Sequence, residues 1–180
     1  MENGLEIATL GGGCFWCLEA VYQQVRGVKA VESGYSGGHL RQPSYEEVCS
    51  GDSGHAEVVR VSFDPSVVTY REILEIFFAI HDPTTLNRQG NDVGTQYRSV
   101  IFTHSQAQRA TAEHVLHELE AGKVFDAPIV TQVEPEQPYW RAEDGHQNYY
   151  QDHPGQGYCA VVISPKLAKF RARFAELLRR

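Results

Sequence analysis

Two cysteines three residues apart follow a run of three glycines, in the segment 11–17 with the sequence GGGCFWC. Apolar residues recur at helical spacing over 18–25, so we expect a helix to begin at or just after Cys14. Residues 5–10 read as a short strand that leads into the glycine turn. Free backbone N–H groups and the positive end of the dipole at a helix start favour a thiolate. Because the thiolate is the reactive form, the pattern predicts Cys14 as a nucleophile.

The same pattern is open to other interpretations. A Cys-x-x-Cys pair also occurs in thioredoxin-like redox proteins and in zinc sites, and a cysteine pair can simply be buried and inert. The four cysteines, Cys14, Cys17, Cys49 and Cys159, do not form the two Cys-x-x-Cys pairs of a structural zinc site. Two rival functions follow: a thiol–disulfide oxidoreductase that uses Cys14 and Cys17, and a redox-sensing or zinc-held regulatory module without turnover.

Side chains elsewhere in the chain could assist a thiolate. Glu57 follows a glycine turn; on the apolar face of a strand its pKa would be raised by desolvation, which would make it a general acid. The alternative is an exposed glutamate at a strand edge. Tyr45 and Tyr97 flank polar loops and either donate phenolic hydrogen bonds or only pack, and Asp92 could be no more than a turn residue. His146 lies in a polar and aromatic cluster and could equally be a hydrogen-bonded core histidine.

Strands and helices alternate along the chain and must bring these candidates together. The length of 180 residues, 42% of them hydrophobic and 22% charged, suits a single domain with a substantial core, residues 1–180. The periodicity predicts strands at 28–31, 56–63, 97–102, 128–133 and 158–163, and helices at 69–81, 105–122 and 164–177. We expect one α+β domain, in which helices cover a mixed or antiparallel sheet.

Composition and charge exclude several classes of protein. The net charge is −7, which argues against nucleic acid and anionic membranes as partners. No apolar run approaches the length that spans a membrane. The first residues, MENG, lack the layout of a signal peptide. We therefore expect a cytoplasmic protein, whose cysteines stay reduced unless they are catalytic or bind a metal.

The cysteine segment and several further motifs resemble those of the A-type peptide methionine sulfoxide reductases. The likeness covers the chain from about residue 5 to the end of the expected strand 158–163. It is carried by GCFWC at 13–17, GYSGG at 34–38, YEEVCSG at 45–51, GHAE at 54–57, QGND at 89–92, GTQYRS at 94–99 and GYC at 157–159. One position departs from the family pattern, because residue 17 is commonly glycine in this family and is cysteine here.

The resemblance implies a two-layer α+β sandwich with a mixed sheet and a split βαβ (ferredoxin-like) core. It also implies reduction of free and peptide-bound methionine S-sulfoxide, as protein repair after oxidative damage. The catalytic cysteine would become a sulfenic acid and then form an intramolecular disulfide, which thioredoxin would recycle. No metal or organic cofactor is needed for this chemistry, and we expect a monomer.

The resemblance assigns a role to each candidate residue. Cys14 would attack the sulfoxide sulfur, and Glu57 would donate the proton. The hydroxyls of Tyr45 and Tyr97 would bind the sulfoxide oxygen. Asp92 would organise the site. Phe15 and Trp16 would hold the substrate methyl group.

Two cysteines compete to resolve the sulfenic acid. Relatives with glycine at position 17 use a cysteine in the C-terminal region, at or near Cys159. Cys17 lies three residues from Cys14, so the ring that it closes is small, whereas Cys159 must approach from a distant strand. We therefore expect Cys17 to resolve first, and Cys159 to act second or as a relay to thioredoxin. The simplest role for Cys49 is packing beside a turn.

Overall fold

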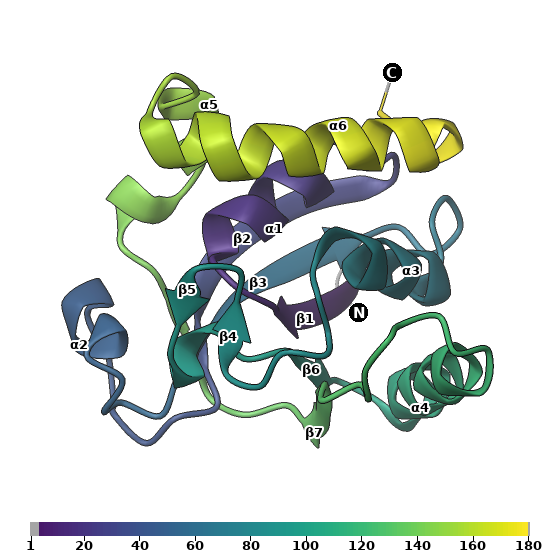
Figure 1. Ribbon diagram of the computed structural model, residues 1–180, viewed down its shortest axis with the longest axis horizontal. Coiled ribbons are helices and arrows are strands. Elements are labelled where there is room, and N and C mark those ends of the chain that lie inside the picture. The colour runs from purple at the N-terminus through teal and green to yellow at the C-terminus, as the bar shows by residue number, and fades with distance from the viewer. Residues whose placement is uncertain (1–3, 180) are drawn as a thin grey trace.

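The computed structural model describes residues 4–179, in which strands and helices alternate (Figure 1). The strands are β1 (Glu6–Gly11), β2 (Val28–Ser36), β3 (Ala56–Phe63), β4 (Arg88–Gln89), β5 (Asp92–Val93), β6 (Val100–Thr103), β7 (Gln132–Pro135) and β8 (Tyr139–Arg141). The helices are α1 (Phe15–Tyr22), α2 (Tyr45–Cys49), α3 (Tyr70–Ile80), α4 (Gln106–Ala121), α5 (Tyr149–Asp152) and α6 (Ser164–Arg173). Between residues 4 and 179, no helix combines the length and the apolar character needed to cross a membrane.

Six strands form one sheet in the order β7-β6-β1-β3-β2-β8. Neighbouring strands are antiparallel except β6 and β7, which run parallel. The expected α+β class and mixed sheet are therefore confirmed. β1 lies between β3 and β6, so the cysteine segment that follows it leaves from the middle of the sheet. β4 and β5 pair only with each other, as a separate hairpin.

The main core lies between one face of the sheet and the helices. α1 contacts β2 and β3, α3 contacts β1, and α4 contacts β6 and β7. α6 contacts both α1 and α3, and it crosses the top of the view in Figure 1. On β3, Val59 and Val61 belong to this core, whereas Ala56 and Val58 belong to a smaller cluster on the other face of the sheet. The alternation of the strand therefore directs Glu57 toward the helices.

The stretch 158–163 is helical, and the strand predicted there is wrong. Cys159–Ile163 form a π-helical turn that runs directly into α6. The buried residues of this stretch and of α6 lie four, four and three positions apart: Cys159, Ile163, Leu167 and Phe170. By contrast, Val161 is 74% exposed. The buried positions of the apolar run and of α6 together have the period of a helix face.

Candidate active site

The reactive turn lies where β1 ends and α1 begins. Cys14 is the N-cap residue of α1, so the helix begins directly after it, as predicted. Gly13 has a φ of +85°, and a Cβ atom at this position would lie 2.7 Å from Cγ of Gln89. Its N–H donates a hydrogen bond to the carbonyl of Tyr97 at 3.2 Å. Glycine is needed here because it adopts this backbone conformation without strain and lets the turn lie against β4.

The electrostatic environment of the Cys14 thiol differs from the prediction. The residue is only 6% exposed, and this burial raises its pKa well above the usual value. The charges of Glu57 and Cys17 raise the pKa further, and the backbone N–H of Trp16 opposes the shift without cancelling it. The expectation that the helix start lowers the pKa is therefore wrong for the resting site. Desolvation is the largest cause of the raised pKa, and the cysteine rests as a thiol.

Glu57 is fully buried on the helix-covered face of β3, and it is not an exposed residue at a strand edge. Its Oε1 accepts a hydrogen bond from the backbone N–H of Phe15 at 3.1 Å, and its Oε2 has no partner among residues 4–179. Burial raises the pKa of Glu57 from 4.5 to about 8, and the hydrogen bond from Phe15 opposes this only in part. The carboxyl group therefore keeps its proton at neutral pH. The Cys14 thiol also lowers the pKa of this carboxyl group, without cancelling the effect of burial, so a proton donor lies near the candidate nucleophile.

Two tyrosines and a third cysteine surround the same carboxyl group. Tyr45 begins α2, and Tyr97 ends the 3-10 turn Thr95–Tyr97. Burial raises the pKa of both phenols, and the charge of Glu57 raises it further. Both tyrosines lower the pKa of the Cys49 thiol, which burial raises, so Cys49 belongs to the site and does more than pack beside a turn. The spacing of four between Tyr45 and Cys49 on one helix face is the signal that connects this cysteine to the site.

Aromatic rings form an apolar wall in the site. Phe15 is fully buried and Trp16 is half-buried. The ring of Trp16 stacks on Tyr149 with 3.7 Å between centroids, and its Nε1–H donates to Nδ1 of His146 at 3.3 Å. Burial lowers the pKa of His146, so the imidazole is neutral and can accept this bond. His146 also stacks on Tyr45 at 4.1 Å, which joins the wall to the phenols.

A chain of hydrogen bonds joins the β4–β5 hairpin to the second cysteine. The hydroxyl of Tyr158 donates to Oδ2 of Asp92 at 2.6 Å and lies 3.8 Å from Sγ of Cys17, with which it shares a hydrogen bond. The N–H of Cys17 donates to the carbonyl of Cys14 at 3.1 Å, which fixes the first turn of α1. The structure thus brings Asp92 and Cys17 together through Tyr158, which lies in the motif GYC at 157–159 but was given no role there. Cys159 is buried as well, and all four cysteines are free thiols.

Comparison with known proteins decides the family. The family model of peptide methionine sulfoxide reductase matches residues 6–178. The chain belongs to this family. One curated relative is the peptide methionine sulfoxide reductase MsrA of Ralstonia nicotianae, which is 65% identical over 181 residues. The match covers 98% of this chain and 95% of that relative.

Solved structures of methionine sulfoxide reductases are similar to this chain. The reduced form of Mxr1 from Saccharomyces cerevisiae has a TM-score of 0.82 and 36% identity, over 88% of this chain and 91% of that one. Mxr1 in complex with Trx2 has a TM-score of 0.58 and 27% identity, over 83% of this chain and 87% of that one. Membership in the family makes this chain an oxidoreductase.

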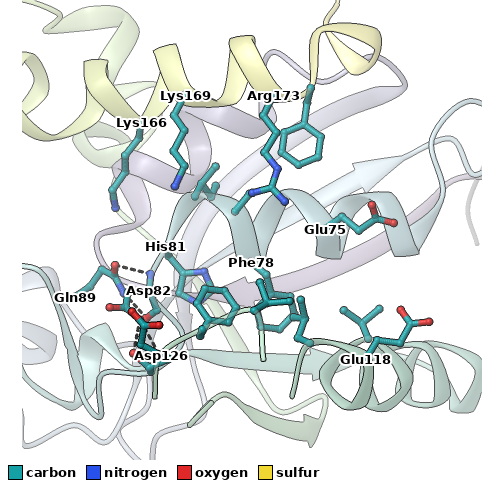
Figure 2. Close-up of a pocket in the computed structure, with 18 of the residues that line it drawn as sticks. Glu75, Phe78, His81, Asp82, Gln89, Glu118, Asp126, Lys166, Lys169 and Arg173 are labelled. Carbon is teal, nitrogen blue, oxygen red and sulfur yellow. Dashed lines mark hydrogen bonds between the residues drawn. The ribbon is translucent and has the colours of Figure 1, made fainter. Parts of the chain in front are cut away.

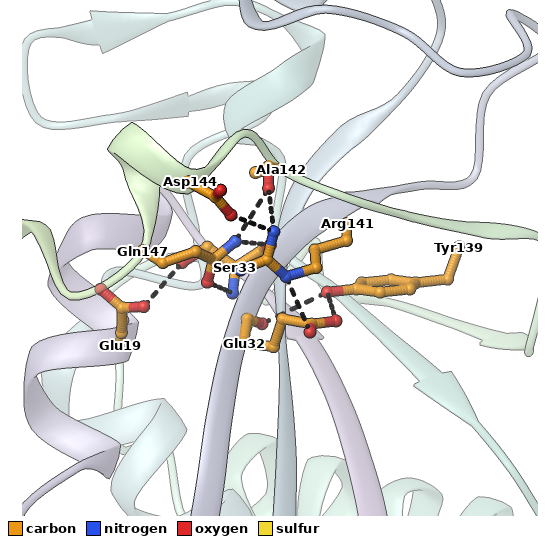
Figure 3. A network of polar contacts seen from close by, with 8 residues as sticks. All are labelled: Glu19, Glu32, Ser33, Tyr139, Arg141, Ala142, Asp144 and Gln147. Atoms are coloured by element: carbon orange, nitrogen blue, oxygen red, sulfur yellow. Dashed lines mark hydrogen bonds and ion pairs between the residues drawn. The ribbon is translucent and has the colours of Figure 1, made fainter.

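In this methionine sulfoxide reductase, a polar network around Ser33 and Gln147 (Figure 3) attaches the segment that carries part of the aromatic wall. Segment 139–150 carries His146 and Tyr149. The side chain of Gln147 donates to the carbonyl of Ser33 at 2.8 Å and accepts from its N–H at 2.9 Å, which attaches the segment to β2. Glu19 of α1 accepts from the N–H of Tyr149 at 3.2 Å and from the Ser33 hydroxyl at 3.4 Å. The segment is thereby tied to both a strand and a helix.

Glu143 attaches the same segment to α2. Its Oε1 accepts from the hydroxyl of Tyr35 at 3.0 Å, and its Oε2 accepts from the backbone N–H of Tyr45 at 2.9 Å. The sequence analysis did not identify Glu143, Glu19 or Gln147, because each acts through a partner that is far away in the chain. The arrangement fixes the ring of Tyr45 against the rest of the wall.

Proposed function

We propose that this enzyme reduces the S epimer of methionine sulfoxide, free or within peptides, with Cys14 as nucleophile and Glu57 as proton donor. The observation that carries the proposal is the buried, protonated carboxyl of Glu57 beside the Cys14 thiol. A sulfoxide has an electrophilic sulfur, a polar oxygen and a small apolar methyl group. Its reduction needs a soft nucleophile, a proton for the oxygen and an apolar clamp, and the site offers candidates for all three.

In the first proposed step, the Cys14 thiolate attacks the sulfoxide sulfur while Glu57 protonates the oxygen. Methionine leaves, and Cys14 becomes a sulfenic acid whose oxygen comes from the substrate and whose proton comes from Glu57. The cysteine sulfur loses two electrons and the substrate sulfur gains them. Because Cys14 rests as a thiol, it must lose its proton to solvent before the attack, and the Glu57 carboxylate regains a proton from solvent after the step. A protonated Glu57 helps here, since it removes the negative charge that raises the pKa of the thiol.

The remaining side chains would bind and orient the substrate. The hydroxyls of Tyr45 and Tyr97 would donate hydrogen bonds to the sulfoxide oxygen as negative charge develops on it. Phe15 and Trp16 would hold the methyl group. Asp92 would act as an organising residue, and its hydrogen bond from the Tyr158 hydroxyl supports that role.

We propose that Cys17 is the first thiol to resolve the sulfenic acid. It attacks the Cys14 sulfur, a disulfide forms and the oxygen leaves as water. Cys14 caps the N-terminus of α1 and Cys17 lies on its first turn, where the Cys17 N–H bonds the Cys14 carbonyl at 3.1 Å, so only a small ring has to close between the two sulfurs. Cys159 would act second or relay the disulfide outward. It does so from a buried helical turn, and not from a strand as expected.

A thioredoxin would then reduce the disulfide by thiol–disulfide exchange and restore both thiols. The complex of a related reductase with Trx2 supports this donor. The proposed biological role is repair of oxidised proteins, by a monomer that works in the cytoplasm and uses no cofactor. We also propose that residues 1–180 form a single catalytic domain and that its core has a split βαβ arrangement.

The test is dithiothreitol-supported turnover of the two epimers of N-acetyl methionine sulfoxide. We expect the S epimer alone to be reduced, and Cys14→Ser to lose this turnover. Reduction of protein disulfides without sulfoxide turnover would identify a general thiol–disulfide oxidoreductase and overturn the proposal.

One turnover without reductant, followed by mass spectrometry of the peptides, tests the order of the cysteines. A Cys14–Cys17 disulfide should form even in Cys159→Ser. A wild-type disulfide from Cys14 to Cys159 or Cys49, together with full thioredoxin-linked turnover in Cys17→Ser, would overturn the order.

A further inference from the structure

A cavity lies apart from the side chains proposed for catalysis. It is a cleft of about 850 Å³ bordered by α3, α4, α6 and the segment 122–128 (Figure 2). This volume is within the range of ligand-binding clefts. Its apolar surface comes from side chains of all four borders: Phe78, Leu119, Phe125 and Phe174. None of the side chains proposed for catalysis lines it.

One wall of the cleft carries a row of positive charges. Lys166, Lys169 and Arg173 are three and four residues apart, which puts them on one face of α6, and Figure 2 shows all three side chains reaching from that helix toward the cleft. Within residues 4–179, none of the three forms an ion pair with an acidic side chain. On the opposite wall, by contrast, Arg71 is paired with both Glu75 and Glu118.

The shape and charge of the cleft narrow the class of ligand. At a rise of about 1.5 Å per residue, the three cations extend over about 10 Å along the helix. A single phosphate cannot contact all of them, whereas a chain with several acidic groups can. Four carboxylates also line the cleft: Glu75 and Glu118, which pair with Arg71, Asp82, which accepts hydrogen bonds from Thr84, and Asp126. These carboxylates and the net charge of −7 disfavour a nucleic acid. A polypeptide with acidic side chains along one edge fits both walls and the apolar surface between them.

The inner end of the cleft adjoins the reactive turn. Gln89 lines the cleft, and its side chain also packs against Gly13, the residue before Cys14. Lys166 lies on the other side of this end. Its positive charge lowers the pKa of Cys17 and so offsets part of the increase that burial causes. A chain that enters the site with its methionine sulfoxide can therefore continue past Gln89 into the cleft.

We propose that this cleft binds an acidic segment of the oxidised polypeptide, next to the methionine sulfoxide that the enzyme reduces. The inference rests on the proposed function and adds a substrate preference to it. Lys169 and Arg173 contact the acidic side chains, and the aromatic side chains contact their apolar neighbours. Oxidised sites in acidic regions of proteins are thus preferred over sites in neutral or basic regions.

Two peptides test the preference, each with one methionine S-sulfoxide and three residues on either side, aspartate in one and asparagine in the other. With dithiothreitol as reductant at low salt, the wild-type KM should be about fivefold lower for the aspartate peptide. The difference should vanish at 1 M salt, where screening acts over about 3 Å. It should also vanish in the double variant Lys169→Gln/Arg173→Gln. Arg171→Gln is the matched control, because Arg171 lies on the same helix but bonds Gln24 and is not part of the cleft.

Turnover of free methionine sulfoxide distinguishes a failure of this inference from a failure of the proposed function. Its KM should be the same in the wild type and in the double variant, because it is too short to reach the cleft. Equal KM values for the two peptides in the wild type, or a preference that survives in the double variant, would overturn this inference alone. A double variant that raises only the KM for thioredoxin would assign the cleft to the reductant and also overturn it. A wild type that reduces no free sulfoxide would overturn the proposed function, and this inference with it.

Discussion

Replacing Glu57 by glutamine should make the enzyme more stable and much slower. Glutamine has the shape of glutamic acid, and its side-chain oxygen can still accept the hydrogen bond that Phe15 donates at 3.1 Å. It cannot ionise, and it cannot give a proton to a sulfoxide oxygen. The substitution should therefore raise the free energy of unfolding and lower the turnover rate, and both changes arise from the burial of Glu57.

The size of the stability effect follows from the pKa of Glu57, which rises from an ordinary value of 4.5 to about 8 in the folded protein. Because the folded value is the higher one, the stability that Glu57 contributes is fully present below pH 4.5 and is lost as pH rises to about 8. One pKa unit corresponds to about 1.4 kcal/mol, so at pH 7 ionisation of Glu57 favours the unfolded state by about 3 kcal/mol. Glu57→Gln should raise the free energy of unfolding by about this amount at pH 7, and by almost nothing at pH 4.

Urea unfolding from pH 4 to pH 8.5 measures this difference, and dithiothreitol-supported turnover measures the rate. Loss of a general acid should slow reduction by about 10²–10⁴-fold, and the wild-type rate should fall as pH rises above about 8. Glu46→Gln is the control, because Glu46 is exposed on α2, and it should change neither quantity. A stability difference that is the same at pH 4 and pH 8 would refute the burial argument, and wild-type turnover in Glu57→Gln would refute the catalytic one.

Further substitutions test the other parts of the site. Cys14→Ser should reduce turnover to below a few per cent of wild type in the dithiothreitol assay, because an alcohol is a far weaker nucleophile than a thiolate. Phe15→Ala should raise the KM and lower the free energy of unfolding by about 3–5 kcal/mol, measured by urea denaturation, because the ring is fully buried. Trp16→Ala should also raise the KM, with a smaller loss of stability because Trp16 is half-buried; an unchanged KM in both variants would place the methyl pocket elsewhere. Tyr45→Phe and Tyr97→Phe should each slow turnover less than loss of the buried carboxyl does, since one hydroxyl remains, and the double variant should be slower than either.

The elements that sequence reasoning predicted well are those whose signal is local. The glycine turn before Cys14, the alternation of β3 and the capping box of α3 each depend on residues within one turn or one strand, and each is found as expected. The strand predicted at 158–163 is wrong because the apolar run from Cys159 to Ile163 suits a strand or a helix equally well. Only its continuation into α6 shows the helical period.

The electrostatics of the site could not be predicted, because they depend on what covers each group. A helix start alone would lower the pKa of Cys14, but tertiary burial raises it instead. For Glu57 the sequence left two possibilities, and burial against α1 decides between them. Tyr158 is in the site through a bond to Asp92, 66 positions away in the chain. Contacts over such separations leave no pattern in a single sequence.

The attachment of segment 139–150 has a consequence for how the enzyme responds to heat. His146 and Tyr149 reach the site from a segment that begins with β8, the edge strand of the sheet, and continues through the contacts of Gln147 to Ser33 (Figure 3), whereas β3 lies in the middle of the sheet and in the apolar core. Segments of this kind open locally at a lower free energy than the core of a fold. Their backbone amides should exchange with solvent faster than those of β3, and turnover should disappear on heating before the sheet melts. The upper working temperature of the enzyme is then set by the detachment of this segment, and the melting of the fold lies above it.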